Sequence, residues 1–369
     1  MGQYWYIFSM DKGEILSCIG KLGEFLWEEE ADCLVDILAV PVKPGPVQSS
    51  CAPMRLIEIS GIKSWPNQKD LEPTRQIQPY LAIIPDELIL KIFHDLDFLS
   101  CFRLSLISTR LWKIGWLFFQ QKATEFMSPW AGAKIICLGD ECKSGDWPVG
   151  LLTAEEENVV NKGLDEAEVD PDEGFFQDPG NLLTLVMCRF REINSKVEPF
   201  QILSDPVPGQ AEDLESPRTA LDEARHLPKS ELSQVRSFAY GEKMANYYPE
   251  TENWILRNLT TAEFVQGDKL FAAFHRPGRQ CGPYLGYPGF GEAVMCRICW
   301  STNHSTVPCA GFNRGVWAGH RFEICTEKIH ALKSDSGWRD ATSEIVDELS
   351  VALNLPTLTK SKKIEDRKQ

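Results

Sequence analysis

The stretch from Leu81 to Ser128 constrains this chain most, because it packs three short amphipathic segments into a small span. Pro85 suits a first helical position, where its missing N–H is not needed. Asp86 and Glu87 follow in the first turn, where carboxylates interact well with the helix dipole. The sequence therefore predicts a helix with a broad apolar face. That face holds Leu88, Ile92 and Leu96 at every fourth position, with Ile89 and Phe93 one step round.

Two more helices are predicted within the same stretch. Asp97 is a suitable N-cap for the second helix, and Ser108 or Thr109 can cap the third. The three helices together carry more apolar surface than a unit this small buries alone. The apolar residues are Phe102, Leu104, Leu106 and Ile107 in the second helix and Leu111, Trp112, Ile114, Leu117, Phe118 and Phe119 in the third.

The stretch resembles an F-box, a module of roughly fifty residues that docks on the adaptor Skp1 in cullin–RING ubiquitin ligases. The F-box pattern begins with Leu-Pro-x-Glu-Leu and ends in a helix that contains a tryptophan. This sequence has Ile84 and Ile107 where the pattern has Leu and Val, and both changes keep an aliphatic side chain. The matching residues are Pro85, Glu87, Leu88, Ile92, Leu96, Leu104, Ser108 and Trp112.

The resemblance implies that the chain is an adaptor and performs no chemistry itself. A Skp1-like protein, and through it a cullin ligase, would be one partner, and a protein target of unknown identity the other. The alternative for this stretch is an ordinary helical hairpin inside a larger core. The residues expected to contact Skp1 are Pro85, Leu88, Ile92, Phe93, Leu96, Leu104 and Trp112.

Composition excludes some other functions. With 369 residues the chain is long enough for one or two domains, and its net charge of −15 argues against general nucleic-acid binding. No apolar run approaches the length of a membrane span, so we expect no membrane partner. Twelve cysteines are scattered without a repeating spacing and without a secretory signal. They are typical of reduced thiols in a cytoplasmic or nuclear protein.

The amino-terminal residues predict a hairpin followed by a helix. Residues 3–18 alternate around a turn at Asp11-Lys12-Gly13, and Glu28 to Leu38 has the spacing of a short helix. The opening MGQYW and the later GKLGE are similar to the start of a set of F-box-like proteins found in fungi.

A Trp-Ala-Gly motif occurs twice, at Trp130 and at Trp317. In both places a cation and a β-favouring apolar run follow, up to Asp140 and Cys325. Both motifs resemble the same fungal family, as do the phrases WILRNLTTAEF and GFGEAVMCRICWST. We predict two equivalent strands in one sheet, with coincidence around a common turn as the alternative.

Between these motifs, residues 153–180 hold ten acidic residues and one lysine, a composition typical of a solvated loop. Residues 204–235 are polar and interrupted by prolines, whereas Leu182 to Phe190 is an apolar island and a predicted helix. The sequence therefore favours a variable, partly disordered insert over residues 153–235.

The carboxy-terminal third predicts further regular structure. Trp254 to Leu259 favours a strand, and Thr260 to Glu263 has the pattern of a capping box that starts a helix. Glu292 to Trp300 alternates as a strand would, and Asp340 to Leu353 has the spacing of an amphipathic helix. The basic residues from Lys360 onward predict a loose tail, with a nuclear signal as the alternative.

Catalytic and metal-binding motifs are weak. Cys296 and Cys299 have zinc-like spacing, and Cys281, His304, Cys309, His320 and Cys325 could complete a site. In the predicted strand, however, residues three apart point to opposite faces, so we expect no zinc. No recognisable hydrolase, phosphate-loop or metalloprotease motif occurs, and we expect no cofactor and no enzymatic activity.

These observations predict an α+β protein with an antiparallel or mixed sheet, in which a three-helix F-box is inserted in or attached to a mixed α+β domain. Target binding would fall to a loop such as Cys281 to Gly291. The alternatives are a small-molecule enzyme or metal protein built on residues 130–355, and an F-box protein that acts outside a ubiquitin ligase. The predicted division is 1–80 for the hairpin and helix, 81–128 for the F-box, 129–152 for the first Trp-Ala-Gly strand, 153–235 for the insert, 236–355 for the carboxy-terminal α+β region and 356–369 for the tail.

Overall fold

The structure is a computed structural model, and it describes residues 2–27, 31–42, 84–162, 181–193, 247–276, 282–304, 311–334 and 337–357. The chain forms two compact units. Unit 1 comprises Met1–Val42, Thr124–Pro199 and Lys243–Gln369, and unit 2 comprises Lys43–Ala123 and Phe200–Glu242.

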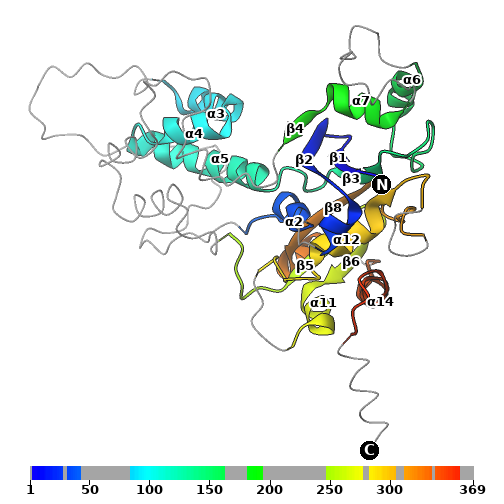
Figure 1. Cartoon of the computed structure of the whole chain (residues 1–369). Coiled ribbons are helices and arrows are strands. Elements are labelled where there is room, and N and C mark those ends of the chain that lie inside the picture. The colour runs from blue at the N-terminus through cyan, green and yellow to red at the C-terminus, as the bar shows by residue number, and fades with distance from the viewer. Residues whose placement is uncertain are drawn as a thin grey trace, which may run out of the picture. The chain divides into compact units, whose positions relative to one another are not determined.

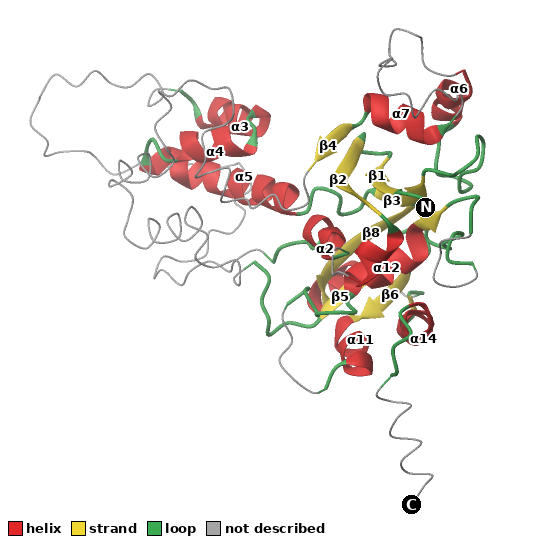
Figure 2. Ribbon diagram, viewed as in Figure 1, coloured by secondary structure: helices red, strands yellow, loops and turns green. Residues whose placement is uncertain are grey.

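Unit 1 is built on one mixed sheet with helices on its faces, which confirms the predicted α+β class (Figures 1 and 2). Its strands are β1 (Trp5–Ser9), β2 (Glu14–Gly20), β3 (Lys134–Gly139), β4 (Arg191–Ile193), β5 (Trp254–Asn258), β6 (Glu263–Gln266), β7 (Cys299–Trp300), β8 (His320–Thr326) and β9 (Arg339–Asp340). Its helices are α1 (Leu22–Trp27), α2 (Asp32–Leu38), α6 (Ala154–Lys162), α7 (Leu182–Arg189), α11 (Gly267–Phe274), α12 (Phe290–Ile298), α13 (Glu327–Lys333) and α14 (Thr342–Ala352).

The strand order is symmetric about the centre of the sheet, so that equivalent strands of the two halves lie equally far from it. It runs β4-β2-β1-β3-β8-β5-β6-β9, with β7 paired to β3 beside this path. Strands from before and after unit 2 therefore share one sheet, as the paired motifs predict. The two strands that follow the Trp-Ala-Gly motifs meet at the centre, where β3 and β8 pair antiparallel.

The two halves of the sheet repeat the same hairpin. In each half a buried tryptophan, Trp5 or Trp254, opens the first strand. The turn then holds a residue with positive φ, 59° at Gly13 and 53° at Ala262, before a glutamate opens the return strand. That glutamate is Glu14 in β2 and Glu263 in β6.

A short edge strand then pairs in parallel with each hairpin. The backbone N–H of Arg191 in β4 donates to Gly13 O at 2.9 Å, and that of Arg339 in β9 donates to Ala262 O at 2.9 Å. Each arginine side chain also pairs with the glutamate of its own hairpin, Arg191 with Glu14 and Arg339 with Glu263.

Each Trp-Ala-Gly motif is fixed by the same three hydrogen bonds. The indole N–H donates to a hairpin glutamate at 2.7 Å, from Trp130 to Glu14 and from Trp317 to Glu263. The tryptophan backbone N–H donates to the preceding helix, at Ile37 O (3.1 Å) or Arg297 O (2.8 Å). The motif glycines bond across the centre of the sheet, Gly132 N to Phe322 O at 2.7 Å and Gly319 N to Ile135 O at 2.9 Å.

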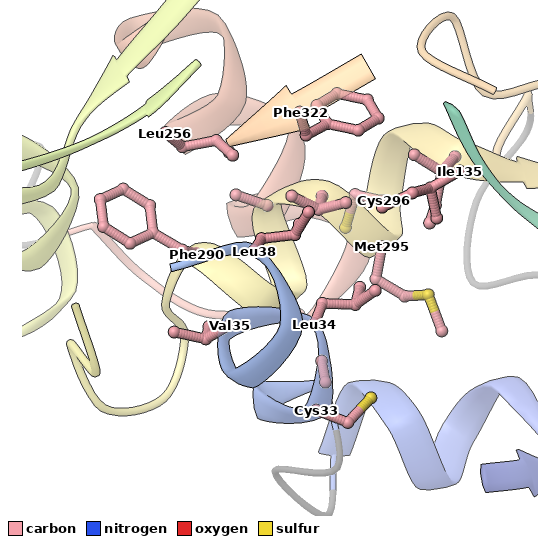
Figure 3. Close-up of a cluster of buried hydrophobic side chains, with 14 of the residues drawn as sticks. Cys33, Leu34, Val35, Leu38, Ile135, Leu256, Phe290, Met295, Cys296 and Phe322 are labelled. Atoms are coloured by element: carbon pink, nitrogen blue, oxygen red, sulfur yellow. The ribbon is translucent and has the colours of Figure 1, made fainter. Parts of the chain in front are cut away.

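The equivalent helices α2 and α12 pack against each other over the main core (Figures 1 and 3). The residue after each helix forms a parallel β-bridge with a central strand of the other half of the sheet. Ala39, after α2, pairs with Ile324 of β8, and Cys299, after α12, pairs with Cys137 of β3. Figure 3 shows Leu34, Val35 and Leu38 of α2 meeting Phe290 and Met295 of α12 under the strands. Unit 1 is thus an internal tandem repeat with approximate two-fold symmetry.

A second apolar core covers the other face of the first half. Tyr6, Phe8, Ile136 and Leu138 point to this face, because alternate side chains of a strand point to opposite sides. Helices α6 and α7 supply its cover, which includes Val160, Leu182, Leu183, Leu185 and Val186.

Several predicted elements are confirmed. The hairpin at residues 3–18, the strands after both Trp-Ala-Gly motifs, the strand from Trp254 and the helix in Leu182–Phe190 are all present. The helix expected up to Leu38 is shorter, because α2 begins at Asp32. In the helix within Asp340–Leu353, the expected inward residues Ala341, Ile345, Leu349 and Ala352 are all buried.

Two expectations were wrong. Residues 290–298 form a helix rather than a strand, started by the side chain of Glu292, which accepts from Gly289 N at 2.7 Å. Thr260 does not start a helix, because Asn258 Oδ1 accepts from Thr260 N (3.0 Å) and Thr261 N (3.4 Å) and closes the hairpin turn.

The insert predicted over residues 153–235 lies only partly within the described residues. Residues 154–162 and 181–193 belong to α6, α7 and β4 of unit 1. Residues 163–180 and 194–235 lie outside the described residues, as do the connection at 43–83 and the tail from residue 358.

Candidate partner-binding surface

Unit 2 is described over residues 84–123, which contain α3 (Asp86–Asp95), α4 (Phe98–Ser105) and most of α5 (Thr109–Met127). All three predicted helices are present, but α4 ends at Ser105, so Leu106 and Ile107, which the sequence places in the second helix, follow it. Asp97 caps α4, with its Oδ1 accepting from Ser100 N at 2.9 Å. Ser108 Oγ accepts from Leu111 N at 3.2 Å at the start of α5. The side chains of Asp97 and Ser108 thus each accept a backbone N–H in the first turn of the helix that follows them.

Aromatic rings hold the three helices together. Phe119 of α5 lies 5.0 Å from Phe102 and 5.2 Å from Phe98 between ring centroids, both on α4. Phe93 of α3 stacks on Phe118 at 6.0 Å. Such ring pairs favour one packing arrangement beyond the area they bury.

Gly115 lets α5 approach the other two helices closely. A Cβ atom at this position would stand 2.2 Å from Ser105 Oγ and 2.5 Å from the Phe93 ring. Ser105 Oγ donates to Cys101 O at 2.7 Å, so the polar atom at this contact is satisfied. Burial raises the pKa of the Cys101 thiol to about 11, so it stays protonated at neutral pH.

A polar clasp joins the start of α3 to α5. Arg110 Nε donates to Asp86 Oδ1 at 3.0 Å, and an Arg110 guanidinium nitrogen donates to Ile84 O at 2.6 Å. Both side chains are partly exposed, so the clasp orients α3 more than it stabilises the unit.

The structure divides the predicted Skp1-binding residues into two groups. Leu88 and Ile92, one helical turn apart on α3, are 55% and 37% exposed. Pro85 is exposed beside them, and Leu96 and Leu104 are half-buried. An exposed leucine and isoleucine on one helix face form an apolar surface available to a partner.

Phe93 and Trp112 form the second group. Phe93 is fully buried and Trp112 is 3% exposed, because both point inward among the aromatic rings of unit 2. They fill the core of unit 2, and their expected contact with Skp1 stays a prediction.

Three other exposed apolar residues of unit 2 lie outside the predicted contact set, and the first is Leu90 on α3, which is 36% exposed. Ile107, between α4 and α5, is 58% exposed, and Leu117 on α5 is 69% exposed. The sequence places Leu117 among the apolar residues of the third helix. Its position five residues after Trp112, well round the helix from that ring, is the signal that separates it from the core.

The CxxC pair lies at the end of α12, where both thiols are buried. Burial first of all, and then its neighbour Cys137, raise the pKa of Cys299 far above the ordinary value, which keeps it a neutral thiol. Within the described ranges no group of three or more His, Cys, Asp or Glu side chains is placed to hold a metal ion. Cys281 and Cys309 lie outside those ranges, so the expectation of no zinc stays a prediction.

The loop suggested for target binding is largely part of the core. Leu285, Pro288 and Gly289 are buried, and a Cβ on Gly291 would stand 2.2 Å from Ala31 O. This segment therefore packs α12 against α2, which leaves little of it for a partner.

No family model, curated protein or solved structure matches this chain. In the part of the chain that the structure describes, no helix is long and apolar enough to cross a lipid bilayer.

Proposed function

We propose that this chain is an F-box adaptor, in which α3, α4 and α5 bind a Skp1-like protein and unit 1 presents a protein target to a cullin ligase. The carrying observation is the exposed pair Leu88 and Ile92 on α3, set against the buried pair Ile89 and Phe93, which lie one residue further along and about 100° round the same helix. The fit of residues 84–112 to the F-box pattern supports it independently.

The two pairs explain why such a helix would need a partner. Ile89 and Phe93 already fill the core of unit 2, so the outward leucine and isoleucine have no role in that core. Covering them would remove apolar area from water, and a few such side chains dominate the binding energy of an interface.

The test is co-purification of Skp1 with the full chain. We expect Leu88→Asp and Ile92→Asp each to weaken binding by at least about 30-fold, equivalent to about 2 kcal/mol, since a carboxylate would be desolvated at the centre of the interface. Leu332→Asp is the matched control, because Leu332 is 86% exposed on α13 of unit 1.

Circular dichroism should show that all three variants stay folded. Undiminished Skp1 binding by both α3 variants would contradict the proposal. Capture of Skp1 without any cullin would instead favour an F-box protein that acts outside a ligase.

A further inference from the structure

The two halves of the sheet have different covers on their outer faces, which point away from α2 and α12. In each half the cover follows a central strand and precedes the short edge strand, as α6 and α7 do after β3 and α13 does after β8. Helices α6 and α7 bury aliphatic side chains on the first half. Helix α13 contacts β5 and β8, yet none of its residues is buried, and Leu332 is 86% exposed. Apolar burial therefore does little to hold α13 in place.

The face under α13 holds a buried cation, its counter-ion and a protected thiol. These are Arg257 of β5 and Glu323 and Cys325 of β8. They point to this face because alternate side chains of a strand point to opposite sides, and their neighbours Leu256 and Ile324 fill the main core. Arg257 is 3% exposed and pairs with Glu323. Cys325 is fully buried and lies just before α13 in the chain.

His330 joins α13 to this face. Its ring lies 4.9 Å from the ring of Phe264 on β6 and 5.2 Å from that of Trp338. Its Nδ1 lies 3.0 Å from Ser334 Oγ, and that hydroxyl accepts from a guanidinium nitrogen of Arg257 at 3.3 Å. A hydroxyl that accepts from Arg257 has its own proton to donate. His330 can accept it at Nδ1 only while that nitrogen is unprotonated.

The charges around His330 oppose a proton on its ring. The nearest cation is Arg257 of β5, and the carboxylates that act on the ring are Glu323 of β8 and Glu327 of α13 itself. Glu323 is already engaged by Arg257 and by Lys333, whose Nζ lies 3.4 Å away. Burial, and then the charge of Arg257, lower the pKa of His330 below its ordinary value of 6.5, and the two carboxylates oppose this shift without cancelling it.

We infer that α13 is a detachable cover of this face, released when His330 takes up a proton. In the attached state the protonated ring would set a second cation beside Arg257 and leave the Ser334 hydroxyl proton without its acceptor. In the detached state water solvates the imidazolium, so this state takes up the proton more readily. The detached population therefore rises as the pH falls below about 6.5, while the main core keeps the rest of unit 1 folded.

The experiment measures the accessibility of the Cys325 thiol in the full-length protein with dithiodipyridine, an aromatic disulfide that labels thiols even in weak acid. Peptide mass spectrometry gives the labelling rate, which is divided by the rate for urea-unfolded protein at the same pH to remove the chemistry of the reagent. We expect this ratio to rise about three- to tenfold between pH 7.5 and 5.5, since a pKa difference of one unit changes a population tenfold. Cys137, which is buried in the main core, should stay protected throughout.

The variant His330→Gln separates a titrating contact from a helix that is merely loosely held. The amide keeps a hydrogen-bonding group but takes up no proton, so the labelling ratio at Cys325 should become independent of pH over this range, whatever its absolute value. His320→Gln is the matched control, because His320 lies at the other end of β8 and its pKa is also lowered by burial. This control should leave the pH dependence at Cys325 unchanged.

A wild-type ratio that stays flat, or an equal pH dependence in His330→Gln, would overturn the inference. A parallel rise at Cys137 would assign the labelling to unfolding of unit 1 as a whole and would overturn it too.

Discussion

Trp130 and Trp317 each combine complete burial with a charged hydrogen-bond partner. Their rings fill the main core, and their N–H groups reach Glu14 and Glu263 at the ends of the hairpins. Arg297 also lies over the Trp317 ring, with its Cζ 4.7 Å from the centroid. Each tryptophan thus ties a helix, a hairpin and the central strands together.

We predict that Trp130→Ala and Trp317→Ala each reduce the free energy of unfolding by about 3–5 kcal/mol, because each leaves a large cavity. Trp317→Phe should cost about 1–3 kcal/mol, since it keeps most of the ring but removes a donor from a buried carboxylate. Urea denaturation measures both, with Trp27→Phe as control because Trp27 is exposed. An alanine variant as stable as the wild type would contradict the core assignment.

His320 gives the protein a pH-dependent stability. Its Nδ1 accepts from the Asn258 side-chain amide at 3.0 Å, which requires this nitrogen to be unprotonated and the ring to be neutral. Burial lowers the pKa of His320 below its ordinary value of 6.5, against the opposing charge of Glu263.

A lowered folded-state pKa means that the unfolded chain takes up a proton first as the pH falls. We therefore predict that the free energy of unfolding declines as the pH drops below about 6.5, and that His320→Gln makes this decline shallower. Denaturation curves between pH 7.5 and 5 provide the measurement. A wild-type profile that is flat over this range would contradict the prediction.

The roles of single residues were the part of the structure that the sequence predicted best. The repeated Trp-Ala-Gly motif predicted two strands in one sheet, because the same local chemistry recurs at both places. The larger repeat around these motifs could not be predicted, because equivalent positions hold different residue types. Ala262 stands where the first hairpin has Gly13, and both have positive φ. Thr260 stands where the first hairpin has Asp11. Thr260 Oγ1 and Asp11 Oδ2 each accept a backbone N–H at 3.0 Å, from Arg321 and Lys134.

At the scale of elements, α12 shows why one helix was missed. Every residue from Phe290 to Ile298 is buried, so apolar and polar positions do not alternate with a helical period. A helix that is buried all round leaves no such pattern, and Val294, Cys296, Ile298 and Trp300 then resemble one face of a strand. Only the glycine before it and Glu292 as the cap pointed to a helix.

Gly291 decides how closely α12 approaches α2. Glycine in a helix ordinarily costs about 0.5–1 kcal/mol relative to alanine, so Gly291→Ala would stabilise an unconstrained helix. Because the added Cβ would stand 2.2 Å from Ala31 O, we predict the opposite sign, a loss of about 1–3 kcal/mol.

The measurement for this variant is thermal unfolding, with the exposed Ser343→Ala on α14 as control. A melting temperature raised by Gly291→Ala would show that the two helices do not pack as described.

At the scale of the whole molecule, unit 1 takes strands from both sides of unit 2. A fragment of residues 130–357 lacks β1 and β2, which leaves one edge of β3 and the second apolar core uncovered. We predict that this fragment does not unfold cooperatively at full-length stability. Differential scanning calorimetry decides the matter, and a transition at the full-length temperature would refute the shared sheet.

The order in which the sheet can close follows from the pairing of β3 with β8 at its centre. These strands are separated by nearly two hundred residues, so β8 leaves the ribosome about 10–40 s after β3 at usual rates of synthesis. For that interval the first repeat has an unpaired central edge, and an open strand edge is a template for wrong pairing with another chain. The exposed β3 edge fits the equivalent strand of another incompletely synthesised copy of the same chain. A duplicated sheet is therefore most exposed to misassembly where several ribosomes translate one messenger RNA.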